Sequence, residues 1–290
     1  MSTTPQRPLR AIQQIQIGRL TSTDDQAREV LARLVSAGFE AIELNGFMTR
    51  PTPMLVRALT KAAGMPVGSG GRLDWARLVA ESGLAVAAFH EDLGTIESRP
   101  AEVAARARQF GARNVVVTGM YRFDYGDDTA VAGLAERLDA AARALAGEGM
   151  RLLYHNHTAE FRRLRSGATA FDVLVERTDP DALDFELDCF WAATAGVDPL
   201  GVMDRLGERL RLLHLTDRGS RISGSTMTPV VKVDSVELGA GNMAVDAIVA
   251  RAAALGVEAV ILETHKNWID NSPLRSAEVS ADVLRRLLPD

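Results

Sequence analysis

The chain is poor in cysteine and in long apolar runs. Its 290 residues include one cysteine, Cys189, which excludes an intrachain disulfide and is compatible with a reducing compartment. No stretch approaches the roughly 18 apolar residues that a membrane-spanning helix needs. The N-terminal segment MSTTPQRPLR also lacks the apolar stretch of a signal peptide. We therefore expect a cytoplasmic protein with no membrane segment.

Excess charge and aromatic residues are also scarce. The net charge is −5 and is spread over both halves of the chain, whereas a nucleic-acid-binding surface is usually strongly basic. We therefore expect no nucleic-acid partner. Aromatic residues make up 5% of the chain but hydrophobic residues 47%, with many Ala, Leu and Val. This composition suits helices packed against a parallel sheet.

Short apolar segments alternate with longer amphipathic or Ala-rich segments along the chain, which predicts strands alternating with helices. The eight predicted strands are 12–18, 40–45, 84–90, 114–120, 151–157, 184–190, 210–217 and 257–264. The predicted helices are 24–37, 51–63, 73–82, 99–110, 128–148, 168–177, 198–206, 243–255 and 275–288. This alternation predicts an α/β protein, a (β/α)8 TIM barrel in which residues 1–290 form a single domain.

The alternative to a barrel is an open, doubly wound sheet. The segment GRLTSTDD after the first predicted strand is not a glycine-rich GxGxxG loop, so the sequence favours the barrel. Two predicted loops, 65–74 and 218–236, are longer than a barrel needs and adjoin the edge where barrel active sites lie. Each is a candidate for a lid over the site.

All the histidines of the chain lie at the C-terminal ends of predicted strands. They are His90, His155, His157, His214 and His265. Asp188 and Glu263 occupy the same edge. In a TIM barrel these strand ends form the rim of the active site. Imidazole and carboxylate groups around one cavity are typical ligands of a divalent metal ion, so we expect a metal-dependent enzyme.

The sharpest motif is Tyr154-His155-Asn156-His157 at the end of a predicted strand. Side chains alternate along a strand, so His155 and His157 are expected to face the same side. The alternative is a pair of surface histidines on a loop. Glu160 follows the motif and is expected to orient His157 or to bind substrate, unless it is a solvent-facing acid at a helix start.

The motifs of the strand ends resemble those of the sugar phosphate isomerase/epimerase family, within the xylose isomerase-like TIM barrel superfamily. The resemblance rests on YHNHxxEF from Tyr154, LDxxW from Leu187, AGxDP from Ala195, HLxD from His214, LGxG from Leu238 and ILE from Ile261. It covers nearly the whole chain, including Ile15–Ile17 and Ile42–Leu44. The superfamily also holds inosose dehydratases, ketose 3-epimerases and endonuclease IV, so the motifs do not name a substrate.

The resemblance implies one divalent ion, most often manganese, with zinc, cobalt or magnesium as alternatives. When the family's ligand positions are carried over residue by residue, the implied ligands of this ion are His155, Asp188, His214 and Glu263. Epimerases of the family commonly have glutamate at the first of these positions and use two metal-bound glutamates as bases on opposite faces of the substrate. His155 replaces the first glutamate, and Thr216 stands where the family has a lysine.

The function that the resemblance implies is a divalent-metal-dependent isomerase or epimerase of a sugar or keto-sugar. The ion would polarise a carbonyl while a base removes a neighbouring proton. The expected acid–base residues are His157 and Glu263, with His90 as a further candidate. The residues expected to bind the carbohydrate are Trp191, Glu160, Asn156 and His265.

Two other activities remain open at this stage. A lyase or dehydratase acting on an inosose or a 3-keto-glycoside is the first alternative, because only one of the two catalytic glutamates remains. An endonuclease IV-like repair enzyme is a remoter alternative, because it would need a three-metal cluster and a basic surface facing DNA. The sequence contains no dedicated phosphate-binding loop, so it gives no support for a phosphorylated substrate. It also leaves open whether the chain forms a homo-oligomer.

Overall fold

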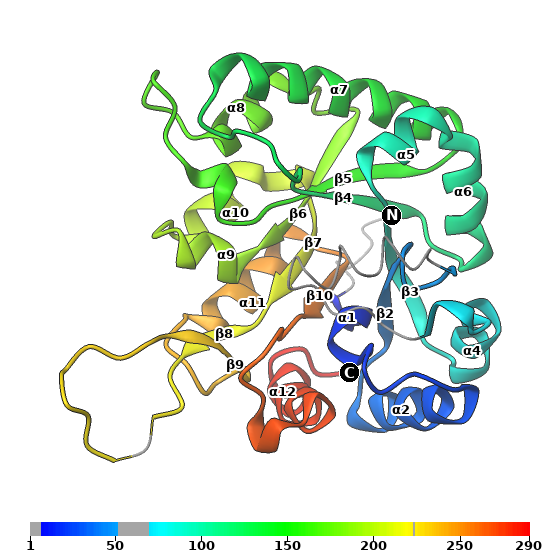
Figure 1. Ribbon diagram of the computed structural model, residues 1–290, viewed down its shortest axis with the longest axis vertical. Helices are drawn as coiled ribbons and strands as arrows, with labels where there is room; N and C mark the ends of the chain where they lie inside the picture. The colour runs from blue at the N-terminus through cyan, green and yellow to red at the C-terminus, as the bar shows by residue number, and fades with distance from the viewer. Residues whose placement is uncertain (1–6, 52–69, 223) are drawn as a thin grey trace.

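The computed structural model describes residues 7–51, 70–222 and 224–290, and these residues build a closed parallel barrel (Figure 1). Round the barrel, the strands follow the order β1-β10-β7-β6-β5-β4-β3-β2. They are β1 (Leu9–Gln13), β2 (Ala41–Asn45), β3 (Ala85–His90), β4 (Asn114–Thr118), β5 (Arg151–His155), β6 (Leu183–Asp188), β7 (Leu210–Leu215) and β10 (Ala259–Leu262). The prediction of an α/β (β/α)8 TIM barrel is confirmed.

Helices connect successive strands and lie around the outside of the barrel (Figure 1). They are α1 (Gln14–Ile17), α2 (Asp24–Ala37), α4 (Trp75–Ser82), α5 (Leu93–Ser98), α6 (Pro100–Gln109), α7 (Asp128–Gly147), α8 (Ala170–Arg177), α9 (Cys189–Thr194), α10 (Pro199–Leu206), α11 (Val245–Leu255) and α12 (Pro273–Leu287). Side-chain caps fix several of their starts; Thr23, for example, accepts a hydrogen bond from the backbone of Gln26. No helix of the described residues is long and apolar enough to cross a membrane.

Two apolar cores hold these layers together. The larger core lies between the strands and the surrounding helices, where α2, α7 and α12 bury one face each. The smaller core fills the inside of the barrel with the side chains of Ala11, Ala41, Ala88, Val116, Leu153, Leu212, Ala259 and Ile261. Because side chains alternate along a strand, the next inward position lies two residues further on. There the barrel interior changes from apolar to polar, with Gln13, Glu43, His90, His155, His214 and Glu263.

Several predicted boundaries are wrong because local hydrogen bonds end the strands early. The first strand is β1, and the segment predicted as its continuation is the short helix α1, whose start is capped by the side chain of Gln13. The sixth strand ends at Asp188, which caps α9. The helix predicted at 99–110 is preceded by α5, which was not predicted. Residues 52–63 of the predicted helix 51–63 and the first half (65–69) of the predicted loop 65–74 lie outside the described residues.

The predicted loop 218–236 is an arm on a two-stranded base. Strand β8 (Asp217–Gly219) pairs antiparallel with β9 (Asp234–Val236), and the segment between them extends away from the barrel (Figure 1). Met227 in this arm is fully exposed. In this arrangement the arm does not cover the strand ends, so the structure does not support its role as a lid.

Candidate metal centre

The four predicted metal ligands meet at the C-terminal end of the barrel. His155 ends β5, Asp188 ends β6, His214 lies in β7 and Glu263 follows β10. One ligand atom from each of these side chains lies within 4.8 Å of the other three, and all four residues are buried. Two imidazole nitrogens and two carboxylate oxygens suit a divalent cation, which binds such atoms at about 2.0–2.2 Å. The residues therefore fit the ion that the sequence predicts.

Neighbouring groups hold these ligands in place. Nδ1 of His214 lies 2.8 Å from Oε2 of Glu263. Oδ1 of Asp188 accepts a hydrogen bond from the backbone of Trp191 at 2.8 Å, which leaves its second oxygen available. Burial raises the pKa of Asp188 to about 6. Burial also opposes ionisation of Glu263, but the nearby His265 and His214 outweigh it and hold the pKa of Glu263 well below its usual range.

Two buried glutamates that the sequence did not predict as site residues lie directly beside the ligand histidines. Oε2 of Glu186 lies 2.9 Å from Nδ1 of His155, and Oε2 of Glu43 lies 2.6 Å from Nε2 of His214. A carboxylate on the outer nitrogen of a ligand histidine fixes the tautomer and the orientation of the ring. Glu186 precedes Asp188 by two residues on the same face of β6, so the alternation of the strand was a signal for it.

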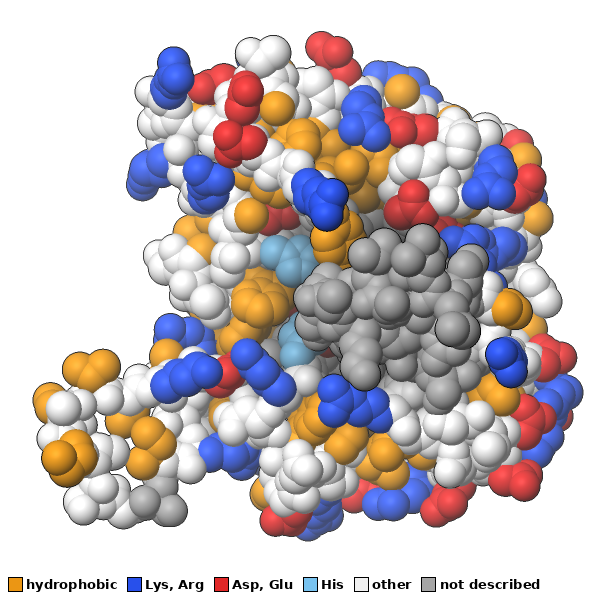
Figure 2. Space-filling view, viewed as in Figure 1, with side chains coloured by type: hydrophobic (Ala, Val, Ile, Leu, Met, Phe, Trp, Pro, Cys, Tyr) orange, Lys and Arg blue, Asp and Glu red, His pale blue; other side chains and the backbone are white. Residues whose placement is uncertain are grey.

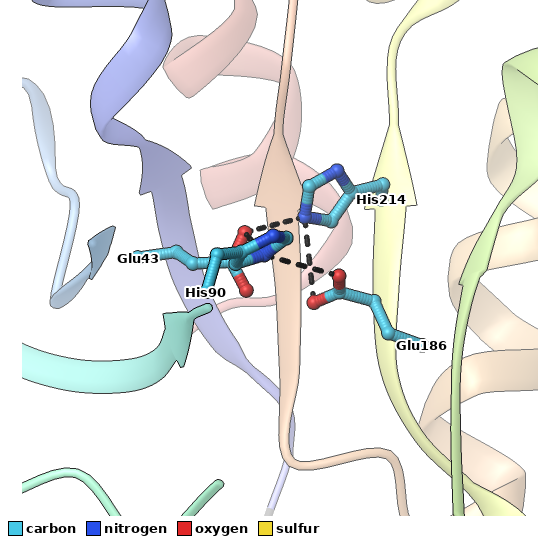
Figure 3. A group of neighbouring side chains, drawn as sticks. All are labelled: Glu43, His90, Glu186 and His214. Carbon is cyan, nitrogen blue, oxygen red and sulfur yellow. Dashed lines mark hydrogen bonds and ion pairs between the residues drawn. The ribbon is translucent and has the colours of Figure 1, made fainter. Parts of the chain in front are cut away.

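His90 lies between these two glutamates and not at the mouth of the site (Figure 3). Its Nε2 is 2.9 Å from Oε2 of Glu43 and 3.4 Å from Oε2 of Glu186. Burial lowers the pKa of His90, but the charges of Glu43 and Glu186 outweigh it and raise the value to about 10. A protonated ring does not accept a proton. Such a ring would have to lose its proton before it could act as a base, and the acid–base role of His90 stays a prediction.

The mouth of the site is formed by three rings that are only partly buried. The ring centroid of Trp191 lies 6.0 Å from that of His157 and 5.9 Å from that of His265. Figure 2 shows histidine side chains at the surface near the centre of the molecule, next to apolar side chains. Burial is the main cause that lowers the pKa of His157 to about 3, so its ring is neutral at pH 7. Trp191 and His265, which are predicted to bind the substrate, thus lie beside His157, the predicted acid–base residue.

Glu160 and Asn156 support the site from within the protein. Glu160 is fully buried, and it accepts hydrogen bonds from Tyr154 Oη at 2.9 Å and from the backbone of His157 at 3.0 Å. The alternative of a solvent-facing acid is wrong, and the contact with His157 agrees with an orienting role. Asn156 is also fully buried, and its amide bonds the backbone N–H and C=O of Asp188. Its predicted contact with substrate is corrected to the positioning of Asp188.

Cys189 follows Asp188 directly at the start of α9 and is fully buried. Burial raises the pKa of its thiol well above the usual value. Asp198 also has a structural role, as the sequence predicts. Its carboxylate accepts a hydrogen bond from the backbone of Leu200, and Pro199 occupies the first turn of α10.

Residues 31–287 match the sequence family described as xylose isomerase-like TIM barrel. The chain belongs to this family. A curated relative, the inosose dehydratase of Geobacillus kaustophilus (strain HTA426), is 32% identical over 84 residues. That match spans 29% of this chain and 26% of the dehydratase, about a quarter of its length. The family agrees with the resemblance in the sequence motifs, and the short match does not carry the activity of the whole relative.

Two solved structures illustrate the fold of this family member. A sugar phosphate isomerase/epimerase from Parabacteroides distasonis ATCC 8503 has a TM-score of 0.75 and 19% identity, over 99% of this chain and 96% of that chain. A xylose isomerase-like TIM barrel protein from Mycobacterium smegmatis in complex with magnesium has a TM-score of 0.65 and 15% identity, over 99% and 98% of the two chains. At these identities the likeness shows the shared barrel alone.

Proposed function

We propose that this family member is a divalent-metal-dependent isomerase or epimerase of a sugar or keto-sugar. The observation that carries the proposal is the set of four buried ligands, His155, Asp188, His214 and Glu263, beside the partly exposed ring of His157. A carbohydrate with a carbonyl next to a hydroxyl group presents two oxygens to such a site. The substrate would be a small molecule, and no nucleic acid is required.

The ligand set is compatible with several divalent ions. Two imidazoles with two carboxylates suit manganese, zinc and cobalt, and we propose manganese as the preferred ion, with zinc, cobalt and magnesium as alternatives. A bound divalent cation supplies a Lewis acid that polarises the substrate carbonyl and makes the neighbouring C–H proton easier to remove. The remaining chemistry falls to the side chains of the chain.

His157 and Glu263 are the proposed proton-transfer residues. The ring of His157 is partly exposed beside the ligands, where one of its nitrogens can face a bound substrate. Glu160 bonds the backbone of His157 and holds this residue beside His155, with ring centroids 5.1 Å apart. Glu263 serves as ligand and as the carboxylate base. Trp191 and His265 flank the entrance and would hold the sugar against these groups.

A dehydratase is the second candidate function, favoured by two observations. The first is the 32% identity with the inosose dehydratase over 84 residues. The second is His155 at the position where epimerases of the family commonly have glutamate, which leaves one carboxylate base in place of two. One base and one acid suffice for an elimination, in which a proton leaves one carbon and a hydroxyl group leaves the next.

Proton exchange in D₂O tests both candidates before a substrate is known. Manganese-loaded enzyme is incubated with keto-sugars and inososes; because bound Mn²⁺ broadens the signals, the ion is removed before NMR follows the loss of C–H signals. Exchange with a rearranged sugar as product supports the isomerase, and exchange with an unsaturated ketone supports the dehydratase. Asp188→Asn serves as the inactive control and Glu258→Gln as a matched charge-neutralising control away from the site. Absence of exchange with every compound in the metal-loaded wild type would refute the proposed function.

A further inference from the structure

A second group of histidines and carboxylates lies deeper in the barrel than the predicted ligands. It consists of Glu43, His90, Glu186 and His214, whose ligand atoms lie within 4.8 Å of one another (Figure 3). The four side chains come from β2, β3, β6 and β7 and point toward one another. Glu43 and Glu186 are both 0% exposed. We call these four residues the deep cluster.

Each glutamate of the deep cluster has one oxygen in a short contact and one without a hydrogen bond, although Oε1 of Glu186 lies 3.4 Å from Nε2 of His214. Oε2 of Glu43 accepts a hydrogen bond from Gln13 at 2.7 Å, and Oε2 of Glu186 contacts Nδ1 of His155 at 2.9 Å. The Oε1 atoms of both glutamates are buried and have no hydrogen-bond partner among the described residues. A buried carboxylate oxygen without a hydrogen bond is costly, because it has lost the hydrogen bonds that water would form with it.

Nε2 of His90 does not donate a hydrogen bond to either of these Oε1 atoms. Its Nε2 lies within 3.4 Å of both glutamates, but it forms no hydrogen bond with a described residue. No Lys or Arg of the described residues forms an ion pair with Glu43 or Glu186. The deep cluster therefore combines two carboxylates, nearby imidazole nitrogens and buried oxygens without hydrogen bonds. Among the described residues, only histidines form ion pairs with its two carboxylates.

We propose that the deep cluster is a second metal site, which binds a zinc ion through Glu43, His90, Glu186 and His214. Imidazole nitrogens and carboxylate oxygens are both zinc ligands, and four of them can form a tetrahedral shell around the ion. Four protein ligands complete such a shell and leave no position for substrate. The second ion would therefore be structural and would hold Glu186 against His155, one of the ligands of the upper site.

His214 belongs to both sites and connects them. Its Nδ1 faces Glu263 of the upper site at 2.8 Å, and its Nε2 faces Glu43 at 2.6 Å and Glu186 at 3.4 Å in the deep cluster. If both nitrogens bind ions, the ring carries no N–H hydrogen and bridges the two metals. The protons that leave His214, and the proton that His90 loses when its Nε2 binds the ion, pass to solvent. The proposal thus extends the proposed function with a second ion and does not depend on which reaction the upper site performs.

Metal stoichiometry tests the proposal. The full chain is expressed with zinc, passed over a desalting column to remove loosely bound ions, and analysed for zinc per chain by mass spectrometry. We expect two ions in the wild type, one in His90→Asn and one in Asp188→Asn, which changes only the upper site. If His90→Asn does not fold, Glu43→Gln takes its place, and X-ray absorption of the wild type reports whether zinc has the nitrogen and oxygen neighbours that the two sites supply.

The outcomes separate this proposal from the proposed function. One ion in the wild type that Asp188→Asn removes would overturn the second site and leave the upper site intact, with His90 as the internal cation. One ion that Asp188→Asn retains but His90→Asn removes would support the deep cluster and overturn the upper site, and with it the proposed function. Two ions in both the wild type and His90→Asn would place the second ion elsewhere and overturn the proposal.

Discussion

The two ends of the barrel balance their charges in different ways. At the N-terminal ends of the strands, carboxylates pair with arginines. Arg10 in β1 contacts Glu40 at 3.2 Å, and Arg151 in β5 contacts Glu258 at 2.6 Å and Asp184 at 3.3 Å. These charges have partners of opposite sign within the chain, so they need no ligand to balance them.

At the C-terminal ends, four carboxylates gather without such partners. Glu43, Glu186, Asp188 and Glu263 contact histidines, amides and the backbone, and no Lys or Arg of the described residues forms an ion pair with them. Buried carboxylates without counter-charges are unfavourable unless a cation joins them. This difference agrees with the proposal that one end stabilises the fold and the other binds ions, and the predictions below test this division of roles.

The largest expected effect comes from Asp188→Asn. Asparagine keeps an oxygen for the cap of α9 but removes the charge of the ligand. We expect loss of the upper ion and a fall in turnover on the order of 10³-fold, because the transition-state charge loses its electrostatic stabilisation. Metal analysis and the exchange assay measure both quantities. Glu258→Gln at the opposite end should retain full metal content, and equal metal content in both variants would contradict the proposed site.

His157→Ala should lower turnover without loss of metal. A general acid–base residue contributes typically on the order of 10²-fold or more. The ring of His157 is partly exposed beside the ligands, so its removal should leave the four ligand side chains in place. Activity and metal content are measured on the same preparation. Loss of the ion together with the histidine would show that His157, and not its neighbour, is a ligand.

His155→Glu tests whether the absence of a second carboxylate base determines the reaction at the upper site. It restores the second carboxylate base, so epimerisation should rise relative to the native reaction. Because Glu186 lies 2.9 Å from His155, the variant is combined with Glu186→Gln to avoid two like charges in contact. The ratio of epimerised to native product is measured at full metal loading, with Glu186→Gln alone as control. An efficient wild-type epimerase whose rate survives both His157→Ala and His90→Ala would contradict this interpretation of His155.

The smallest effect is expected at the N-terminal end. A hydrogen bond from Arg7 is the largest cause that lowers the pKa of Glu40 to about 2, against the opposing effect of burial. The ionised form is thus favoured in the folded state, and its contribution is present above about pH 4.5 and is lost as the pH falls toward 2. Glu40→Gln should cost about 1 kcal/mol at pH 7 for such a partly exposed pair.

Urea unfolding at pH 7 and pH 3 measures this prediction. The difference in unfolding free energy between the wild type and Glu40→Gln should shrink at the lower pH, and the metal content should not change. An equal difference at both pH values would show that Glu40 stabilises the fold by packing and not by its charge. A loss of metal in this variant would contradict the division between the two ends.

The sequence predicted the barrel from local signals, whereas the choice of the four proposed ligands among the strand-end residues came from the resemblance to the family. Alternating apolar segments define the strands, and the ligands follow the strand ends. Glu43 and Glu186 were missed because their meeting depends on the closure of the barrel, which brings β2 and β6 to the same interior. Asn156 was misassigned because its partner is the backbone of the neighbouring strand, which carries no signal in the residue types.

The burial of Cys189 makes the chain convenient for site-specific labelling. A thiol with no exposed surface and a raised pKa is largely in its unreactive form and out of reach of maleimide reagents. A cysteine introduced in place of Met227, which is fully exposed in the arm, would then be the one reactive thiol of the chain. A spin label there, with a paramagnetic ion in the upper site, would measure the distance between the arm and that ion in solution.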